Sequence, residues 1–206
     1  MSNKPALIAT VIVAVSAVAA VLFTAVKLTS DDEDNKAEPD GAEYGPTEET
    51  ADEMWGAVVR LVGDNHTVLR LFYTVGMPHE EEAYGNPPED GYYTAVTSEY
   101  ADVEEIFGLV RNTFAEPAAE RIINDPSGRG PVYKDKNGKI GVSEKFERLE
   151  YNINWENPPC EIIEFISDTE CEIRITLTNG DGEPEIKDMG MKKGSDGVWR
   201  LDDLIF

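Results

Sequence analysis

The sequence predicts an α+β protein with an N-terminal transmembrane helix, followed by helices packed on a curved antiparallel sheet. Three observations carry this prediction: a long uncharged stretch near the start, a helical apolar period in the first half of residues 50–206, and strand-like alternation in the second half. They divide the chain into a cytoplasmic N-terminus (1–5), a membrane segment (6–28), an acidic disordered linker (29–49) and an extracellular α+β domain (50–206).

The membrane segment begins with residues 6–26, which carry no charge. A helix of this length spans about 31 Å, the thickness of the bilayer hydrocarbon core. Lys4 weakly favours an N-terminus inside the cell. A cleaved secretory signal is the alternative, because residues 17–19 (Ala-Val-Ala) match its cleavage pattern. The chain is thus expected to be a single-pass cell-membrane protein with an extracellular C-terminal domain, or else a secreted protein.

Charge excludes one large class of partners. The chain has 41 acidic and 18 basic side chains, a net charge of −23. Residues 1–29 contribute +2 and residues 30–50 contribute −8, which leaves −17 for residues 51–206. Such a domain repels phosphate backbones, so no nucleic-acid partner is expected. Two Cys and two His are too few for a Cys/His zinc site, and no cofactor or metal is expected.

Helical signals follow the linker. Thr50 and Glu53 stand at capping-box spacing, which predicts a helix over residues 50–61. Residues 68–75 either continue this helix or form an element of their own, and His66 is expected in a turn. A second helix is expected after a Ser98 cap and a third over residues 117–123. The apolar stripe of the second helix comprises Val103, Ile106, Phe107, Val110 and Phe114.

Strand signals dominate the second half. Asn137-Gly138 predicts a tight hairpin turn between residues 132–134 and 140–142. Short turns between further alternating stretches predict an antiparallel meander, with one face buried beneath the helices. The buried face should include Cys171, Ile173, Ile175, Leu177 and Trp199. The expected strands cover residues 91–96, 149–155, 160–167, 171–179, 185–192 and 198–205.

The two cysteines are not expected to form a disulfide. A turn centred on residues 168–169 places Cys171 opposite Ile166 and Cys160 opposite Leu177. The cysteines then lie about 20 Å apart along the sheet, whereas a disulfide needs Cα atoms within about 7 Å.

The sequence offers only weak evidence for a set of catalytic residues, so an enzyme is not expected. The sequence has no glycine-rich phosphate loop and no strand-turn-helix nucleophile motif. A Cys–His pair would require His66 or His79, expected on the helical side, to meet a cysteine, and both cysteines are expected at core strand positions. Tyr92, Tyr93 and Asp202 suit proton transfer only if they meet at the mouth of a conical sheet, and packing or turn roles are the simpler interpretation.

The amino-acid sequences of several segments, and their order along the chain, indicate a function more specifically than composition does. These segments are ADVEEIF at 101–107, VYKDKNGKI at 132–140, ISDTE at 166–170 and DGVWRLDD at 196–203. Together they resemble the IseA family of D,L-endopeptidase inhibitors over residues 50–206. The resemblance implies a cystatin-like or NTF2-like fold and a protein that inhibits NlpC/P60-type peptidoglycan endopeptidases, thereby regulating cell-wall hydrolysis. Two alternatives stay open: an NTF2-like extracytoplasmic ligand-binding or sensor module, and a structural envelope protein.

A candidate partner-binding segment combines carboxylates with aromatic rings. Carboxylates steer the encounter with a partner, and aromatic rings anchor the contact. An endopeptidase cleft that accepts substrate carboxylates beside a reactive cysteine would be occluded reversibly by such a surface, with no covalent step. A solvated loop without a partner is the alternative. The candidate residues are His79, Glu80, Glu81, Glu82, Tyr84, Asp90, Tyr92 and Tyr93.

Overall fold

The computed structural model describes residues 45–80, 88–96 and 99–206, which belong to one compact unit, Glu43–Phe206. Residues 1–44 lie outside the described residues. They include the predicted cytoplasmic and membrane segments and most of the predicted linker. Within the described ranges, no helix is long and apolar enough to cross a membrane. The predicted linker ends too late, because Glu48 and Glu49 already belong to the first helix.

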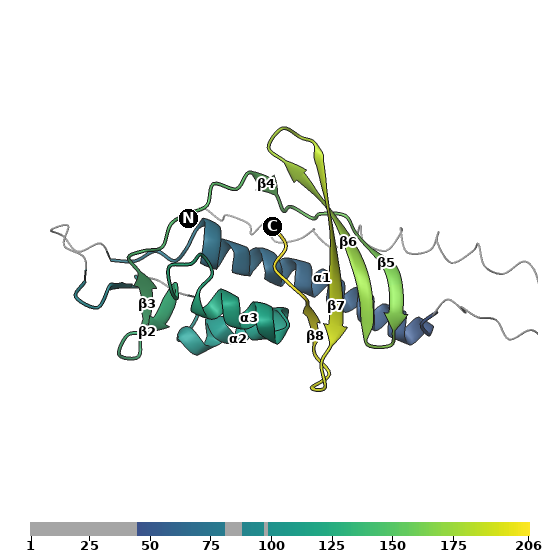
Figure 1. The fold of residues 1–206 in the computed structure, drawn as a ribbon, viewed down its shortest axis with the longest axis horizontal. Helices are drawn as coiled ribbons and strands as arrows, with labels where there is room; N and C mark the ends of the chain where they lie inside the picture. The colour runs from purple at the N-terminus through teal and green to yellow at the C-terminus, as the bar shows by residue number, and fades with distance from the viewer. Residues whose placement is uncertain (1–44, 81–87, 97–98) are drawn as a thin grey trace, which may run out of the picture. The chain divides into compact units, whose positions relative to one another are not determined.

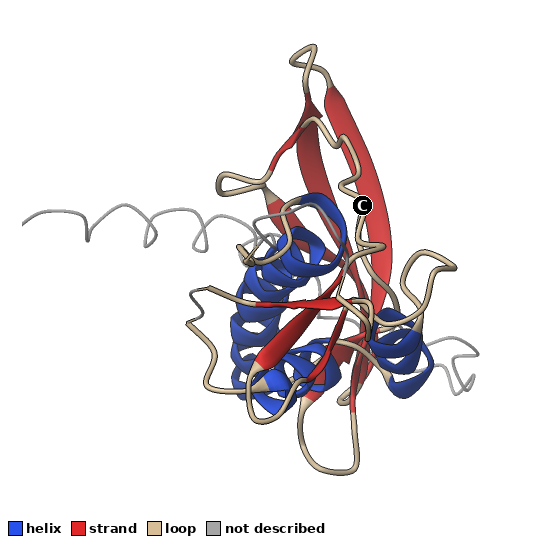
Figure 2. Ribbon diagram, turned by 90° about the vertical axis from the view of Figure 1, so that its left-hand side faces the viewer, coloured by secondary structure: helices blue, strands red, loops and turns tan. Residues whose placement is uncertain are grey.

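The α+β class is confirmed, with helices and a strongly curled antiparallel sheet (Figures 1 and 2). The helices are α1 (Glu48–Leu69), α2 (Val103–Thr113) and α3 (Glu116–Asn124), with a π-helical segment η1 (Arg70–Thr74) directly after α1. A three-stranded sheet has the order β1 (Tyr92–Thr94), β3 (Ile140–Ser143), β2 (Tyr133–Asp135). The curled sheet contains β4 (Ile153–Asn154), β5 (Cys160–Ser167), β6 (Glu170–Asn179), β7 (Pro184–Lys193) and β8 (Trp199–Leu201).

Helix α1 begins earlier and ends later than the sequence predicts. Thr47 is the N-cap, and its hydroxyl accepts a hydrogen bond from Thr50 N at 3.2 Å. The helix runs through His66, so the predicted turn there is wrong. Buried apolar side chains on both sides of that position stabilise the helix against the weak local propensity of Gly, Asp and Asn. Residues 68–69 continue α1 and residues 70–74 form η1, which ends just before Val75.

Helix α2 starts at a different cap from the one expected. Asp102 Oδ1 accepts from Glu105 N at 3.0 Å, while Glu105 Oε2 accepts from Ala101 N at 2.6 Å, which satisfies free donors at the helix start. Ser98 lies outside the described residues. The predicted stripe is confirmed, with Phe107 half-buried and the other four side chains fully buried. Helix α3 has the expected proline in its first turn.

The predicted hairpin forms between β2 and β3. Asn137 and Gly138 both have positive φ, 57° and 77°, as the tight two-residue turn requires. Strand β1 pairs with the other edge of β3, with Tyr93 opposite Val142. Local turn chemistry predicted the hairpin, but its pairing with residues 92–94 is a long-range contact.

The register of β5 on β6 differs from the prediction. Ser167 pairs with Glu170, as a two-residue turn requires, but two irregularities in β5 then shift the pairing. Cys171 therefore faces Phe165, and Cys160 faces Ile175. The expectation that the cysteines stay unpaired is confirmed, since both are free thiols.

The predicted buried face of the curled sheet is confirmed. Cys171, Ile173, Ile175 and Leu177 are completely buried, and Trp199 is 4% exposed. These side chains share one core with the buried residues of α1, α2 and α3. The strands expected over 149–155 and 198–205 are much shorter, at Ile153–Asn154 and Trp199–Leu201.

Candidate functional site

The candidate segment, residues 79–93, connects the end of η1 to the three-stranded sheet. The structure describes His79, Glu80, Asp90, Tyr92 and Tyr93. The other three candidate residues, Glu81, Glu82 and Tyr84, lie outside the described residues. The described candidates lie at the two ends of the segment.

The first end is fixed against β1. Glu80 N donates to Thr94 O at 2.9 Å, and His79 forms an antiparallel bridge with Ala95. The His79 ring stacks on Tyr93, with ring centroids 5.0 Å apart, while its Nδ1 lies 3.0 Å from Met77 O. The Glu80 side chain is exposed, while its backbone is held in place by β1.

The second end is fixed against the same sheet. Gly91 N donates to Pro88 O at 2.8 Å, and Gly91 O accepts from Glu144 N at 2.9 Å, just beyond β3. The φ of Gly91 is +70°, a conformation that favours glycine. Both ends of the acidic stretch are thus tied to one small sheet.

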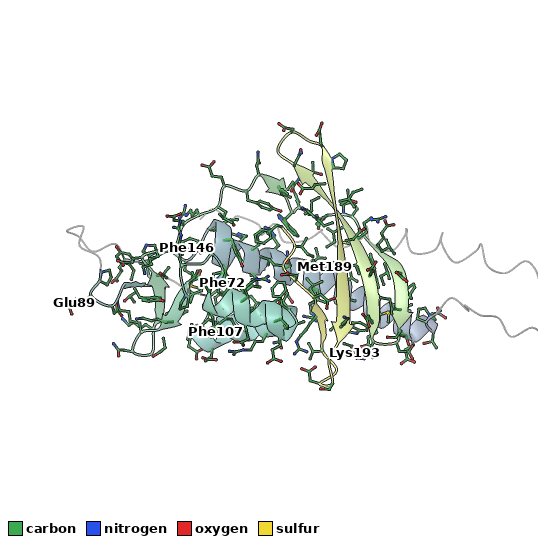
Figure 3. The ribbon with its side chains drawn as sticks, in the orientation of Figure 1. Phe72, Glu89, Phe107, Phe146, Met189 and Lys193 are labelled. Atoms are coloured by element: carbon green, nitrogen blue, oxygen red, sulfur yellow. The ribbon has the colours of Figure 1, made fainter. Side chains whose placement is uncertain are left out.

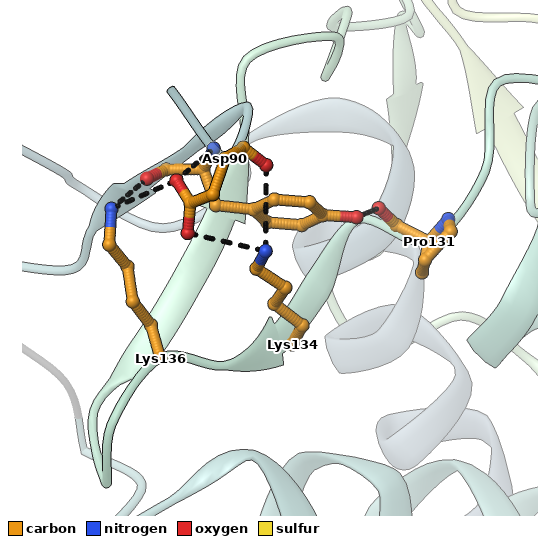
Figure 4. A network of polar contacts seen from close by, with 5 residues as sticks. Asp90, Pro131, Lys134 and Lys136 are labelled. Carbon is orange, nitrogen blue, oxygen red and sulfur yellow. Dashed lines mark hydrogen bonds and ion pairs between the residues drawn. The ribbon is translucent and has the colours of Figure 1, made fainter. Parts of the chain in front are cut away.

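Asp90 lies at the centre of a cationic network (Figure 4). Its carboxylate oxygens lie 3.3 Å from Lys134 Nζ and 3.3 Å from Lys136 Nζ, and Oδ1 accepts from Tyr92 N at 3.2 Å. Lys134 Nζ also lies 4.0 Å from the centre of the Tyr92 ring, and Tyr92 Oη donates to Pro131 O at 2.9 Å. Asp90 and Tyr92 therefore hold β1 and β2 together.

The pKa of Asp90 is set by burial and by its hydrogen-bond donors. Desolvation raises the pKa of Asp90, but the hydrogen bonds from Tyr92 N and the two lysines outweigh it and lower the pKa below its ordinary value. The same lysines offset the charge of the carboxylate. Sequence reasoning missed Lys134, which lies in β2, and Lys136, which directly follows β2. Their position beside Asp90 depends on the pairing of β1 with β3.

The alternative catalytic arrangements gain no geometric support. His66 stacks on Trp155 and His79 on Tyr93, so neither ring is directed to a thiol by these contacts. Burial raises the pKa of both cysteines, that of Cys171 to about 11, which disfavours the reactive thiolate. Across residues 45–80, 88–96 and 99–206, no three His, Cys, Asp or Glu side chains are grouped to hold a metal ion.

Asp202 lies in a different environment from the two tyrosines. It follows β8 and is 3.7 Å from Lys192 Nζ on the curled sheet, whereas Tyr92 and Tyr93 belong to the three-stranded sheet. The conical mouth that would bring these three side chains together is therefore not formed by the described strands.

No protein-family model matches the chain, and no curated protein does either. The fold and the geometry define an α+β domain with two antiparallel sheets, whose acidic and aromatic segment 79–93 is tied to the smaller sheet at both ends.

Proposed function

We propose that the chain is a membrane-tethered extracellular protein that binds and inhibits an NlpC/P60-type D,L-endopeptidase of peptidoglycan, and so regulates cell-wall hydrolysis. The resemblance of residues 50–206 to the IseA family supports this class of target enzyme. The observation that carries the proposal is the anchoring of both ends of segment 79–93, at Glu80 and at Gly91.

Anchored ends favour binding by this segment. A binding segment whose flanks are already ordered loses less conformational freedom on association, so more of the contact energy appears as affinity. The stretch between the anchors contains Glu81, Glu82 and Glu89 in addition to Glu80. An exposed carboxylate such as that of Glu80 steers a partner over about 8 Å at physiological ionic strength. The aromatic rings of Tyr84 and Tyr93 are suitable contact anchors.

The proposed mode is reversible occlusion of the endopeptidase cleft, without catalysis or a cofactor in this chain. The cell envelope is the proposed location, because residues 6–26 are long and apolar enough to span a bilayer. Protease added to intact cells should remove the C-terminal domain and leave the anchor in the membrane. Protection of the domain until the membrane is broken would refute this orientation, and a mature protein that begins near Ala20 would establish secretion instead.

The functional test is an inhibition assay with the full chain and an NlpC/P60 endopeptidase of the same cell. Inhibition is expected without cleavage of the inhibitor, and it should weaken with added salt. The triple variant Glu80→Gln, Glu81→Gln, Glu82→Gln should inhibit less, mainly through slower association. Tyr84→Ala should act through faster dissociation, because a lost anchor shortens the life of the complex.

A matched triple variant separates steering by this segment from net charge. Glu116, Glu150 and Glu156 are exposed and make no ion pair in the described part of the chain. Their replacement by Gln removes the same three charges elsewhere and should leave association nearly unchanged. Equal potency of the two triple variants would remove segment 79–93 from the mechanism. No inhibition of any co-occurring endopeptidase would refute the proposed function.

A further inference from the structure

An open pocket of about 540 Å³ lies where α1 passes into η1, and it shares no residue with segment 79–93. This volume is within the range of about 300–1,000 Å³ typical of small-ligand sites. The pocket combines apolar side chains with one cation and one anion. Its lining residues are Thr67, Arg70, Leu71, Val75, Gly76, Met77, Pro78 and Glu99.

Neither charged group of the pocket forms an ion pair with another residue that the structure describes. No carboxylate of the described residues lies within 4.0 Å of the Arg70 guanidinium, and Glu99 has no cation within that distance. This is unusual for an arginine in so acidic a domain. Most other described arginines are paired: Arg60, Arg111, Arg121, Arg129, Arg174 and Arg200.

The backbone that forms the pocket wall is held in a specific conformation. Val75 N and Gly76 N both donate to Arg70 O, at 2.8 and 3.0 Å, which closes the π-helical segment. Gly76 has a φ of +70°, and a Cβ there would lie 2.5 Å from the ring of Phe146, labelled in Figure 3. Both the positive φ and the nearby ring favour glycine at this corner. Single π-helical turns are common at functional sites, and this one carries Arg70 and Leu71 into the pocket.

We propose that this pocket binds a small amphoteric ligand, an amino acid or short peptide that carries a carboxylate, an ammonium group and an apolar body. Arg70 receives the carboxylate through its forked N–H donors, and Glu99 receives the ammonium group. Leu71, Met77 and the 41% exposed Val75 contact the apolar body. The inference goes beyond the inhibitor proposal and does not depend on it.

The direct test measures binding of defined probes to the detergent-solubilised full chain by calorimetry. The probes are leucine, the tripeptide Ala-Leu-Ala, its C-terminal amide and its N-acetyl derivative. Removal of one ligand charge should weaken binding about tenfold or more, because a charged hydrogen bond is lost at each blocked end. Tighter binding of leucine assigns a free amino acid, and tighter binding of the tripeptide assigns a peptide. Binding of neither overturns the proposal.

Substitutions assign each ligand end to its residue. Arg70→Gln should weaken binding about tenfold and abolish the preference for the free acid over the amide. Glu99→Gln should abolish the preference for the free amine over the acetylated probe. Arg148 and Glu150 are exposed, lie outside the pocket and provide matched controls as Arg148→Gln and Glu150→Gln.

Wild-type affinity of Arg70→Gln for all probes would overturn the proposal. The comparison of blocked and free probes on the wild-type chain needs no substitution, so it remains decisive if a variant does not fold. Equal affinity of the wild-type chain for the free acid and the amide would also overturn it.

Discussion

Asn65 and Ile205 hold each other through two hydrogen bonds across 140 positions of sequence. Asn65 Nδ2 donates to Ile205 O at 3.0 Å, and Ile205 N donates to Asn65 Oδ1 at 2.9 Å. Asn65 is completely buried in α1. Residues 204–205 have no neighbouring strand, and the Asn65 side chain satisfies the backbone N–H and C=O of Ile205 instead. Residues 204–205 therefore pack along α1 although they are outside the sheet.

Asn65→Ala should therefore lower the free energy of unfolding by about 2–5 kcal/mol, because it leaves a buried N–H and a buried C=O of Ile205 unsatisfied. Urea unfolding followed by far-UV circular dichroism measures this change. Asn124→Ala is the control: Asn124 is exposed, and among the described residues its side chain bonds to Glu120 of its own helix, so a change within about 0.5 kcal/mol is expected. Similar losses in both variants would contradict the role of the buried pair.

The core prediction compares neighbours on opposite faces of β6. Ile175 is completely buried, whereas the Arg174 side chain is 37% exposed and is paired with Asp188 at 2.7 Å. Ile175→Ala should cost about 2–5 kcal/mol, as large-to-small changes in a packed core do. Arg174→Ala should cost at most about 1 kcal/mol, because exposed ion pairs contribute little. Equal losses in chemical denaturation would show that the buried face of β6 is assigned incorrectly.

A third prediction concerns acid stability at the turn before β8. Asp196 accepts hydrogen bonds from both terminal nitrogens of Arg200, at 2.9 and 2.7 Å, and from Val198 N at 3.1 Å. These bonds lower the pKa of Asp196 from 3.8 to about 2. The folded state thus binds fewer protons than the unfolded state between these values, and the stabilisation is present above about pH 4 and lost as the pH falls toward 2.

Asp196→Asn should accordingly flatten the dependence of the melting temperature on pH between about 4 and 2. Asp181→Asn, at an exposed turn residue without an ion pair in the described part of the chain, should leave that dependence unchanged. An unchanged slope in Asp196→Asn would show that this carboxylate does not govern acid stability.

Within the proposed inhibitor function, two acids of the same segment should behave differently. Glu80→Gln removes an exposed charge and should slow association with the endopeptidase. Asp90→Asn should alter association less, because Lys134 and Lys136 already offset the charge of that carboxylate. It should instead lower the melting temperature by loosening the contacts among Asp90, Lys134 and Tyr92. Stopped-flow association rates and thermal unfolding of both variants test this; a larger kinetic effect in Asp90→Asn would contradict the assignment.

The sequence predicted the elements whose signals are local. The Asn137-Gly138 turn needs only two adjacent residues able to adopt positive φ, and the buried face of β6 follows from alternation along one strand. The stripe of α2 is equally a matter of spacing within one helix. In each of these cases, the residues that determine the structure lie within a few positions of one another.

The remaining features depend on contacts between distant residues. His66 lies in a helix and not in a turn, because core packing outweighs local propensity. Because of the irregular pairing along β5, Cys160 lies opposite Ile175 and not opposite Leu177, and no local motif predicts this shift. The lysines beside Asp90 and the pocket of Arg70 and Glu99 exist only after separate elements pack together. The sequence alone determined the fold class, the acidity of the domain and most of its elements; tertiary packing decided registers, charge partners and pocket, because these depend on which distant side chains become neighbours.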